Sequence, residues 1–138
     1  TWWPQLFLGI TFNWGALMGW AAATGSIAPA AVLLYVGGVF WTLAYDTIYA
    51  HQDIEDDMRA GIKSTALHFG ARSKTYVQYF LIAAIVCFVL AKYLAGATVL
   101  TGLLILPIAG HALWQMKVWQ PDSATSSLRV FRANTIFG

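Results

Sequence analysis

Acidic residues are concentrated in one short stretch of this chain, and their spacing suits metal chemistry. Four of the six lie between positions 53 and 57, and Asp46 lies shortly before them. On a helix, the carboxylates of Asp53 and Asp57 would share a face, with Tyr49 one turn earlier and Asp46 two turns earlier. Like charges on one helical stripe repel one another, and at the C-terminal end of a helix they also oppose the helix dipole. We therefore expect a cation to offset them.

The expected cation is Mg²⁺, bound together with a diphosphate. Mg²⁺ prefers oxygen ligands and binds through one or two carboxylates plus substrate phosphates. Four of the eight basic residues follow the acidic cluster, and such side chains hold phosphate oxygens. They are Arg59, Lys63, Arg72 and Lys74. Together these groups would stabilise the negative charge of a departing diphosphate. The residues alone leave one alternative open, which is a solvated charged loop of any helical membrane protein.

Composition places the chain in a membrane. Its 138 residues are 59% hydrophobic and 10% charged, and the mean hydropathy is +0.62. Soluble domains carry about 25% charged residues, so this chain has too little polar surface for a water-soluble globule. The net charge of +2 is divided between two clusters, which argues against a nucleic-acid surface. The single cysteine, Cys87, cannot form an internal disulfide.

Four apolar segments are long enough to cross a bilayer core of about 30 Å. They cover residues 5–24, 30 to about 57, 76–94 and 99 to about 118. The second is expected to be one continuous helix whose acidic end leaves the membrane. The fold class predicted is all-α: a polytopic transmembrane bundle with four complete spans and the start of a fifth, in a single membrane domain over residues 1–138.

Individual residues refine this prediction. Gly61 is expected to end the second helix, Ser64 or Thr65 to cap a short helix, and Pro107 to kink the fourth span. Two polar side chains inside the spans, Asn13 and His111, are interpreted as hydrogen-bonded packing residues. Trp2 and Trp3 are expected in an interfacial aromatic belt. A polar region over 117–132 is expected to precede the fifth helix.

The distribution of Lys and Arg predicts the orientation. Cytoplasmic loops carry an excess of these residues. The 51–76 connection holds four of them and the 117–132 region holds three, whereas the turns at 25–29 and 95–98 hold none. Both charged regions are therefore expected on the cytoplasmic side. The membrane that we expect is the inner membrane of a bacterium. The chain begins without Met, and we expect it to be part of a longer protein.

The stretch around the acids resembles the second aspartate-rich motif of the UbiA superfamily of intramembrane prenyltransferases. The matching letters are YDT at 45–47, YA at 49–50, D at 53, DD at 56–57, GIKSTA at 61–66 and FG at 69–70. The preceding span, PQLFLGITFNWGALMGWAA, is similar to the same family, so the resemblance covers most of the chain. The sequence of this motif is most similar to that of the members that act on 4-hydroxybenzoate in ubiquinone biosynthesis.

The resemblance implies a bundle of nine transmembrane helices in which two aspartate-rich motifs face each other. It implies Mg²⁺-dependent ionisation of a polyprenyl diphosphate, followed by attack of the ring carbon ortho to the hydroxyl of 4-hydroxybenzoate. The roles implied are metal binding for Asp53 and Asp57, with Asp56 as a further candidate, and lining of the catalytic site for Asp46 and Tyr49. Lys63 is implied to contact the diphosphate. Arg59 is a second diphosphate candidate because of its charge and its position beside the acids.

One part of the family pattern is absent from this chain. The first motif, N-D-x-x-D-x-x-x-D, has no match, since no acidic residue precedes Asp46. We expect the chain to be the C-terminal half of the enzyme and to be inactive alone. Two alternatives remain: a sibling prenyltransferase with another aromatic acceptor, and a non-catalytic helical membrane protein such as a transporter or assembly factor. An upstream helix with the first motif would favour the enzyme.

Overall fold

The computed structural model describes residues 1–136, and these form helices joined by short connections. Four helical segments are long and apolar enough to cross a membrane, which confirms the all-α polytopic fold: Pro4–Thr24, Pro29–Ala50, Thr65–Leu94 and Val99–Val118. The helices are α1 (Pro4–Phe12), α2 (Trp14–Thr24), α3 (Pro29–Ala50), α4 (Ile54–Ala60), α5 (Thr65–Phe69), the 3-10 turn η1 (Gly70–Arg72), α6 (Ser73–Leu94), α7 (Val99–Gly102), α8 (Ile105–Val118), α9 (Ala124–Ala133) and η2 (Asn134–Ile136).

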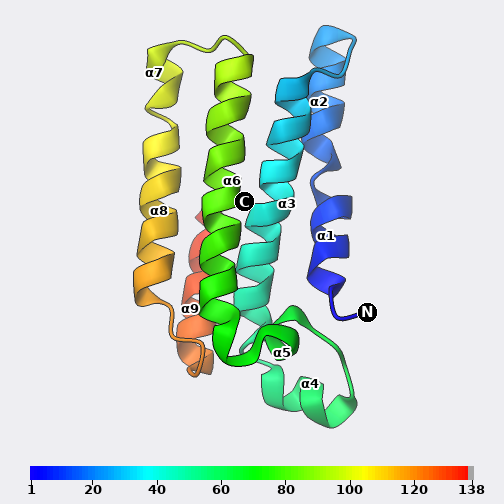
Figure 1. Cartoon of the computed structure of the whole chain (residues 1–138), viewed down its shortest axis with the longest axis vertical. Coiled ribbons are helices and arrows are strands. Elements are labelled where there is room, and N and C mark those ends of the chain that lie inside the picture. The colour runs from blue at the N-terminus through cyan, green and yellow to red at the C-terminus, as the bar shows by residue number, and fades with distance from the viewer. Residues whose placement is uncertain (137–138) are drawn as a thin grey trace.

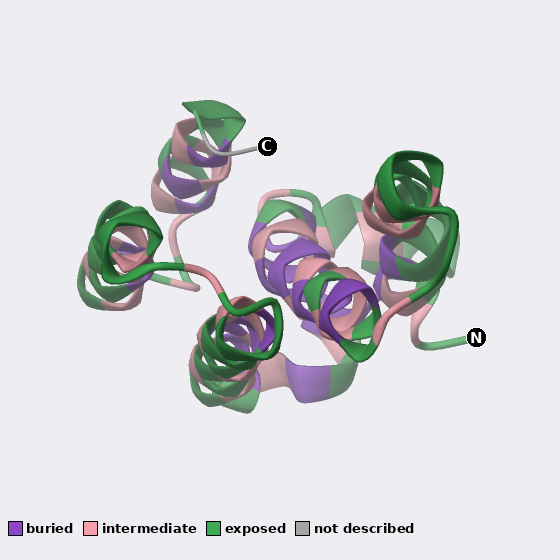
Figure 2. Ribbon diagram, turned by 90° about the horizontal axis from the view of Figure 1, so that it is seen from above, coloured by how far each residue is buried: buried purple, intermediate pink, exposed green. Residues whose placement is uncertain are grey.

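Helix α3 is the centre of the bundle. It lies between α1 and α2 on one side and α6, α8 and α9 on the other (Figures 1 and 2), and it carries much of the buried surface. Gly37 allows α6 to approach closely, because a Cβ at this position would lie 2.6 Å from Cε1 of Phe88. The buried core joins residues of five segments: Trp41, Ala44, Ile48, Val77, Leu81, Ala84, Ala112, Trp119 and Val130.

The first span, expected over 5–24, is confirmed as Pro4–Thr24, and it is divided at Asn13 into α1 and α2. The Asn13 side-chain amide donates to the carbonyl oxygen of Gly9 at 2.7 Å and to Oγ1 of Thr42 at 3.0 Å. A side chain that bonds to nearby backbone offers an alternative to regular helix, which accounts for the break. The bond to Thr42 on α3 confirms the packing role. Gly38 is required opposite, since a Cβ there would lie 2.4 Å from Oδ1 of Asn13.

The fourth span is interrupted as Pro107 predicts, but the interruption lies one turn earlier. Helix α7 ends at Gly102 and α8 begins at Ile105. Proline has no N–H to donate to the carbonyl four residues before it, so the carbonyl of Leu103 loses its helical donor. His111 lies within α8, where its ring is close to those of Trp41 and Trp114, at centroid distances of 6.2 and 5.6 Å. These contacts agree with a packing role.

Both charged regions lie at one end of the bundle, as the Lys and Arg distribution requires. The α4–α5 connection and the loop after α8 share the lower end in Figure 1, and the turns after α2 and α6 share the upper end. The 117–132 region is not a plain polar connection, however. Helix α9 begins inside it at Ala124, because the Ser123 side chain accepts a bond from the N–H of Ser126 at 3.2 Å and caps the helix. It is the fifth helix that the sequence predicted, but it begins earlier than expected and is not among the four candidate spans of the described residues. Residues 137–138 lie outside the described part.

Candidate functional site

The acidic residues stand at the beginning of a helix and not at the end of one. Helix α3 stops at Ala50 and α4 starts at Ile54, so the expectation of one helix from 30 to 57 is wrong. Asp53 is the N-cap residue of α4, and the next three acids occupy its first turn. The N-terminal end of a helix favours negative charge, so the expected conflict with the helix dipole does not arise. The break also separates Asp46 and Tyr49 from the helical stripe of Asp53 and Asp57.

His51, the C-cap residue of α3, is buried at this break. The residue is only 6% exposed, and the edge of its ring meets Trp119, with centroids 5.2 Å apart. Burial lowers the pKa of His51, an effect that the Pro121 backbone and Asp122 partly offset. The imidazole is therefore mainly neutral at pH 7 and adds little positive charge beside the acids.

Asp53 and Asp57 remain one helical turn apart. The N–H of Asp57 donates to the carbonyl oxygen of Asp53 at 2.8 Å, and Asp53 is exposed whereas Asp57 is partly buried. Asp56 instead points to Arg59, with 3.8 Å between Oδ1 and Nη1, and both side chains are largely exposed. An exposed pair of this kind contributes little to stability.

The described residues do not form a metal centre by themselves. Within residues 1–136 no group of three or more His, Cys, Asp or Glu side chains could hold a metal ion. Asp53 and Asp57 nevertheless fit Mg²⁺ chemically, because this ion is bound through one or two carboxylates and takes further oxygens from phosphates and water. These two carboxylates would make up half of a Mg²⁺ site whose other ligands come from a second aspartate-rich motif.

Asp57 and Lys63 line the same cavity. Its volume is about 310 Å³, and its other lining residues are Trp2, Met58, Gly61, Ile62 and Leu67. Lys63 Nζ lies 5.3 Å from the centroid of the Trp2 ring, a cation–π contact that holds the ammonium group over the aromatic face. Gly61 adopts φ +67° and ends α4, as expected, which turns the chain back towards the cavity. Arg59 is not among the lining residues.

Asp46 and Tyr49 form a separate part of the candidate site, in the last turns of α3. They are three residues apart and so are neighbours on the helix surface. Asp46 is partly buried, and Tyr49 is 37% exposed. The ring of Tyr49 packs on Phe131 of α9, with centroids 4.5 Å apart. Sequence reasoning did not identify Phe131, because α9 was expected to start after it.

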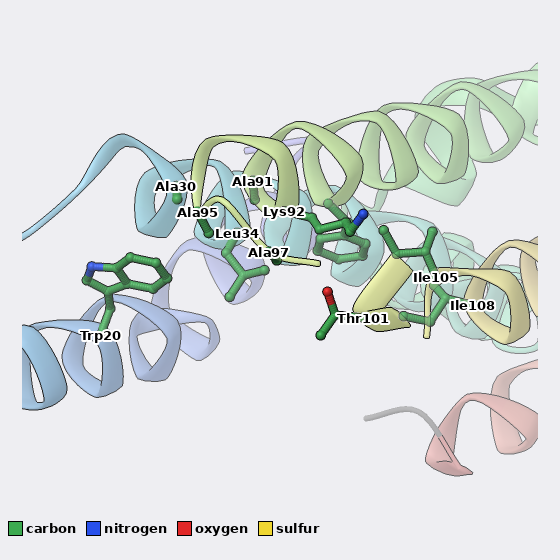
Figure 3. Close-up of a pocket in the computed structure, with 11 residues that line it drawn as sticks. Trp20, Ala30, Leu34, Ala91, Lys92, Ala95, Ala97, Thr101, Ile105 and Ile108 are labelled. Carbon is green, nitrogen blue, oxygen red and sulfur yellow. The ribbon is translucent and has the colours of Figure 1, made fainter. Parts of the chain in front are cut away.

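An apolar groove begins near this part of α3 and follows the bundle to its other end. It consists of three adjoining cavities of about 320, 340 and 340 Å³. The first two share Phe12 and Tyr45, and the second and third share Leu34, Phe88 and Ile108. At the far end, shown in Figure 3, Trp20 comes from α2, and Lys92 and Thr101 add polar groups from α6 and α7.

Comparison with known proteins gives a consistent picture. The profile described as "UbiA prenyltransferase family" matches residues 1–137. The chain is similar to "4-hydroxybenzoate polyprenyltransferase, mitochondrial" of Arabidopsis thaliana, with 47% identity over the whole chain and 34% of the relative. It is 52% identical to the Homo sapiens protein of that name over 71% of the chain and 27% of the relative.

A third relative is named for a different prenyl donor. "4-Hydroxybenzoate geranyltransferase 2" of Lithospermum erythrorhizon is 41% identical over the whole chain and 45% of the relative. The chain thus spans between about a quarter and just under half of the length of these curated relatives. No solved structure matches it.

Proposed function

The chain belongs to the UbiA prenyltransferase family, and from this premise we propose that the whole protein transfers a polyprenyl group from polyprenyl diphosphate to the ring of 4-hydroxybenzoate, in ubiquinone biosynthesis. The observation that carries the proposal is a cavity lined by both Asp57 and Lys63, in a bundle that also holds the apolar groove described above. A diphosphate needs the first feature and a polyprenyl chain needs the second. The relatives named above support the choice of acceptor.

The residues of this chain divide the task of ionising the diphosphate. Asp53 and Asp57 would hold Mg²⁺, with Asp56 as a further candidate ligand once it leaves Arg59. The bound ion would neutralise charge that develops on the leaving diphosphate. Lys63 donates hydrogen bonds to the phosphate oxygens from its side of the cavity, and such charge-assisted bonds are stronger than neutral ones. Arg59, at the surface, is a secondary diphosphate ligand.

Asp46 and Tyr49 act on the part of the substrate inside the membrane. Asp46 is partly buried at membrane depth, where a carboxylate is energetically costly. Ionisable residues in membrane spans usually serve a function. We assign Asp46 the electrostatic stabilisation of the allylic cation that remains when diphosphate departs. The packed rings of Tyr49 and Phe131 supply aromatic surface near the same turns of α3, and Phe131 also lines the groove. The groove takes the apolar chain of the donor, and lipid covers the outer faces of the spans.

The site of action is a membrane. Four helices of the described part have the length and composition of membrane spans. In finer detail, we propose that the 51–76 connection faces the cytoplasm, which the excess of Lys and Arg at that end supports. The sequence expectation of a bacterial inner membrane receives no support from the Arabidopsis and human relatives, which are named as mitochondrial.

A transfer assay tests the proposal directly. Membranes containing the full-length protein are supplied with 4-hydroxybenzoate and labelled polyprenyl diphosphate, with and without EDTA. We expect label in a prenylated hydroxybenzoate, and we expect transfer to stop when EDTA removes Mg²⁺ and to return when Mg²⁺ is added back. Shorter donors are included because the Lithospermum relative is named for geranyl transfer. Transfer to a different aromatic would keep the reaction and replace the acceptor, and no transfer to any acceptor would refute the enzyme assignment.

Replacement of Lys63 by Ala tests its place in the diphosphate pocket. We expect the KM for polyprenyl diphosphate to rise about 10-fold, because a charge-assisted hydrogen bond to the substrate is lost. The KM for 4-hydroxybenzoate should change much less. Lys117→Ala is the matched control, since Lys117 is an exposed cation of α8 that lines none of the cavities described above. A larger change for the aromatic acid than for the diphosphate would remove Lys63 from this pocket.

A further inference from the structure

A buried chain of hydrogen bonds begins two residues after Lys63, at Thr65, and joins three helices. The N–H of Thr65 donates to Oε1 of Gln5 on α1 at 3.1 Å. The hydroxyl of Thr65 and that of Thr47 on α3 are 2.8 Å apart, and either can donate. Thr47 and Thr65 have no exposed surface and Gln5 is 7% exposed. Thr65 is thereby bonded to α1 through its backbone and to α3 through its side chain.

The position of Thr65 determines where Lys63 can lie. Thr65 is the first residue of α5 and follows Lys63 by two positions, with Ser64 as the N-cap between them. Ser64 is buried, and its side chain accepts a bond from the N–H of Leu67 at 3.4 Å. The segment from Gly61 to Lys63, by contrast, is exposed. The buried bonds of Thr65 are therefore the nearest fixed point from which the exposed Lys63 extends.

The beginning of α1 contacts the same segment a second time. Trp2 lies under the ammonium group of Lys63, and the ring of Trp3 meets that of Phe69 edge to face, with centroids 5.3 Å apart. Gln5 thus contributes the hydrogen bond in a contact surface whose other members are aromatic. Thr47 directly follows Asp46 in α3, so its bond to Thr65 also connects the turn of Asp46 to the Lys63 segment.

We propose that Gln5, Thr47 and Thr65 are positioning residues that hold Lys63 at the cavity that it lines together with Asp57. The inference rests on the proposed function for what Lys63 binds. It goes beyond that proposal by assigning a role to three residues that touch neither substrate. Without the bonds to Gln5 and Thr47, the start of α5 would move relative to α1 and α3. Lys63 would then sample positions from which it cannot reach the phosphate oxygens.

We call the hydrogen bonds that join Gln5, Thr47 and Thr65 the clamp. The first test measures its effect without any substrate. Amide hydrogen exchange is followed in the full-length protein in lipid nanodiscs, for the wild type, Gln5→Met and Thr65→Val. We expect faster exchange over residues 62–65 in both variants, with the amide of Thr65 itself most affected by Gln5→Met, which removes its acceptor at nearly constant length. Thr65→Ser, which keeps the hydroxyl, should exchange as the wild type does. Thr11→Val is the matched control, because its hydroxyl bonds to the carbonyl of Phe7 within α1 at the surface. Unchanged exchange in Gln5→Met and Thr65→Val would overturn the clamp.

The second test asks whether the clamp acts through Lys63. We expect Thr65→Val to raise the KM for polyprenyl diphosphate at least about fivefold and Thr65→Ser to restore it. In the background Lys63→Ala, Thr65→Val should cause no further rise, because residues that act through one another are not additive. Additive effects would overturn the positioning role. If Lys63→Ala itself left the KM unchanged while transfer continued, the diphosphate assignment of Lys63 would fail. The proposal that Thr65 acts through Lys63 would then fail with it. The exchange data would still decide whether the hydrogen bonds hold residues 62–65 in place.

Discussion

Replacement of Asp53 or Asp57 by Asn is expected to reduce prenyl transfer by at least about 100-fold in the full-length protein. Each change removes one negative charge and one strong oxygen ligand from the end of the bundle that would hold Mg²⁺, and it leaves the size of the side chain nearly unchanged. The measurement is the labelled transfer assay, with membrane insertion followed in parallel. Insertion should be normal, because both residues lie outside the four spans.

Glu55→Gln is the matched control for these two variants. Glu55 lies in the same first turn of α4 and is exposed, but it lines a different cavity, with His51 and Asp122. It should retain most of the wild-type activity. If Asp53→Asn and Asp57→Asn were as active as Glu55→Gln, the assignment of the metal ligands would be wrong. Asp56→Asn adds a comparison, since loss of its exposed pair with Arg59 costs little by itself.

Replacement of Trp119 by Ala is expected to cause the largest loss of stability, about 3–5 kcal/mol in the free energy of unfolding. Trp119 is 1% exposed, and its indole N–H donates to Oγ of Ser127 at 3.0 Å. Its carbonyl oxygen accepts a bond from Lys74 Nζ at 2.8 Å, so the residue ties the loop after α8 to α6 and α9. The measurement is unfolding of the full-length protein in mixed micelles.

Two further variants separate the contributions of Trp119. Trp119→Phe keeps an aromatic ring against His51 but leaves the Ser127 hydroxyl without its donor, and it should cost about 1–2 kcal/mol. Trp14→Ala is the matched control, because Trp14 is 53% exposed on α2 and should cost well under about 1 kcal/mol. Equal losses for Trp119→Ala and Trp14→Ala would contradict the assigned role of Trp119.

Much of the fold followed from local features of the sequence. Apolar runs of membrane length predicted the four spans, and the basic residues predicted which connections share an end of the bundle. Gly61 was correctly expected to end a helix, because a positive φ is cheap only for glycine. Asn13 was correctly interpreted as an interhelical donor. These features depend on chain chemistry within a few residues, or on the transfer of a whole segment from water to lipid.

The acidic cluster shows what the sequence did not determine. Helical spacing alone allowed one continuous helix from 30 to 57, with Asp46, Tyr49, Asp53 and Asp57 on one face. The structure breaks the helix at 51–53, where His51 packs against Trp119, a residue far along the chain. The start of α9 at Ala124 depends on a serine cap that the charge pattern concealed.

The sequence by itself determined that this is a membrane-embedded member of a prenyltransferase family, and it predicted the acidic and basic residues that we propose for its chemistry. The tertiary structure decided how those residues are grouped: Asp57 with Lys63 around one cavity, Asp46 with Tyr49 and Phe131 at the mouth of a groove, and Arg59 away from both. It also brought Gln5 to Thr65, 60 positions apart in the chain. The physical reason is that spacing fixes which side chains share a helix face, whereas contacts between helices depend on how the buried surfaces of all of them fit together.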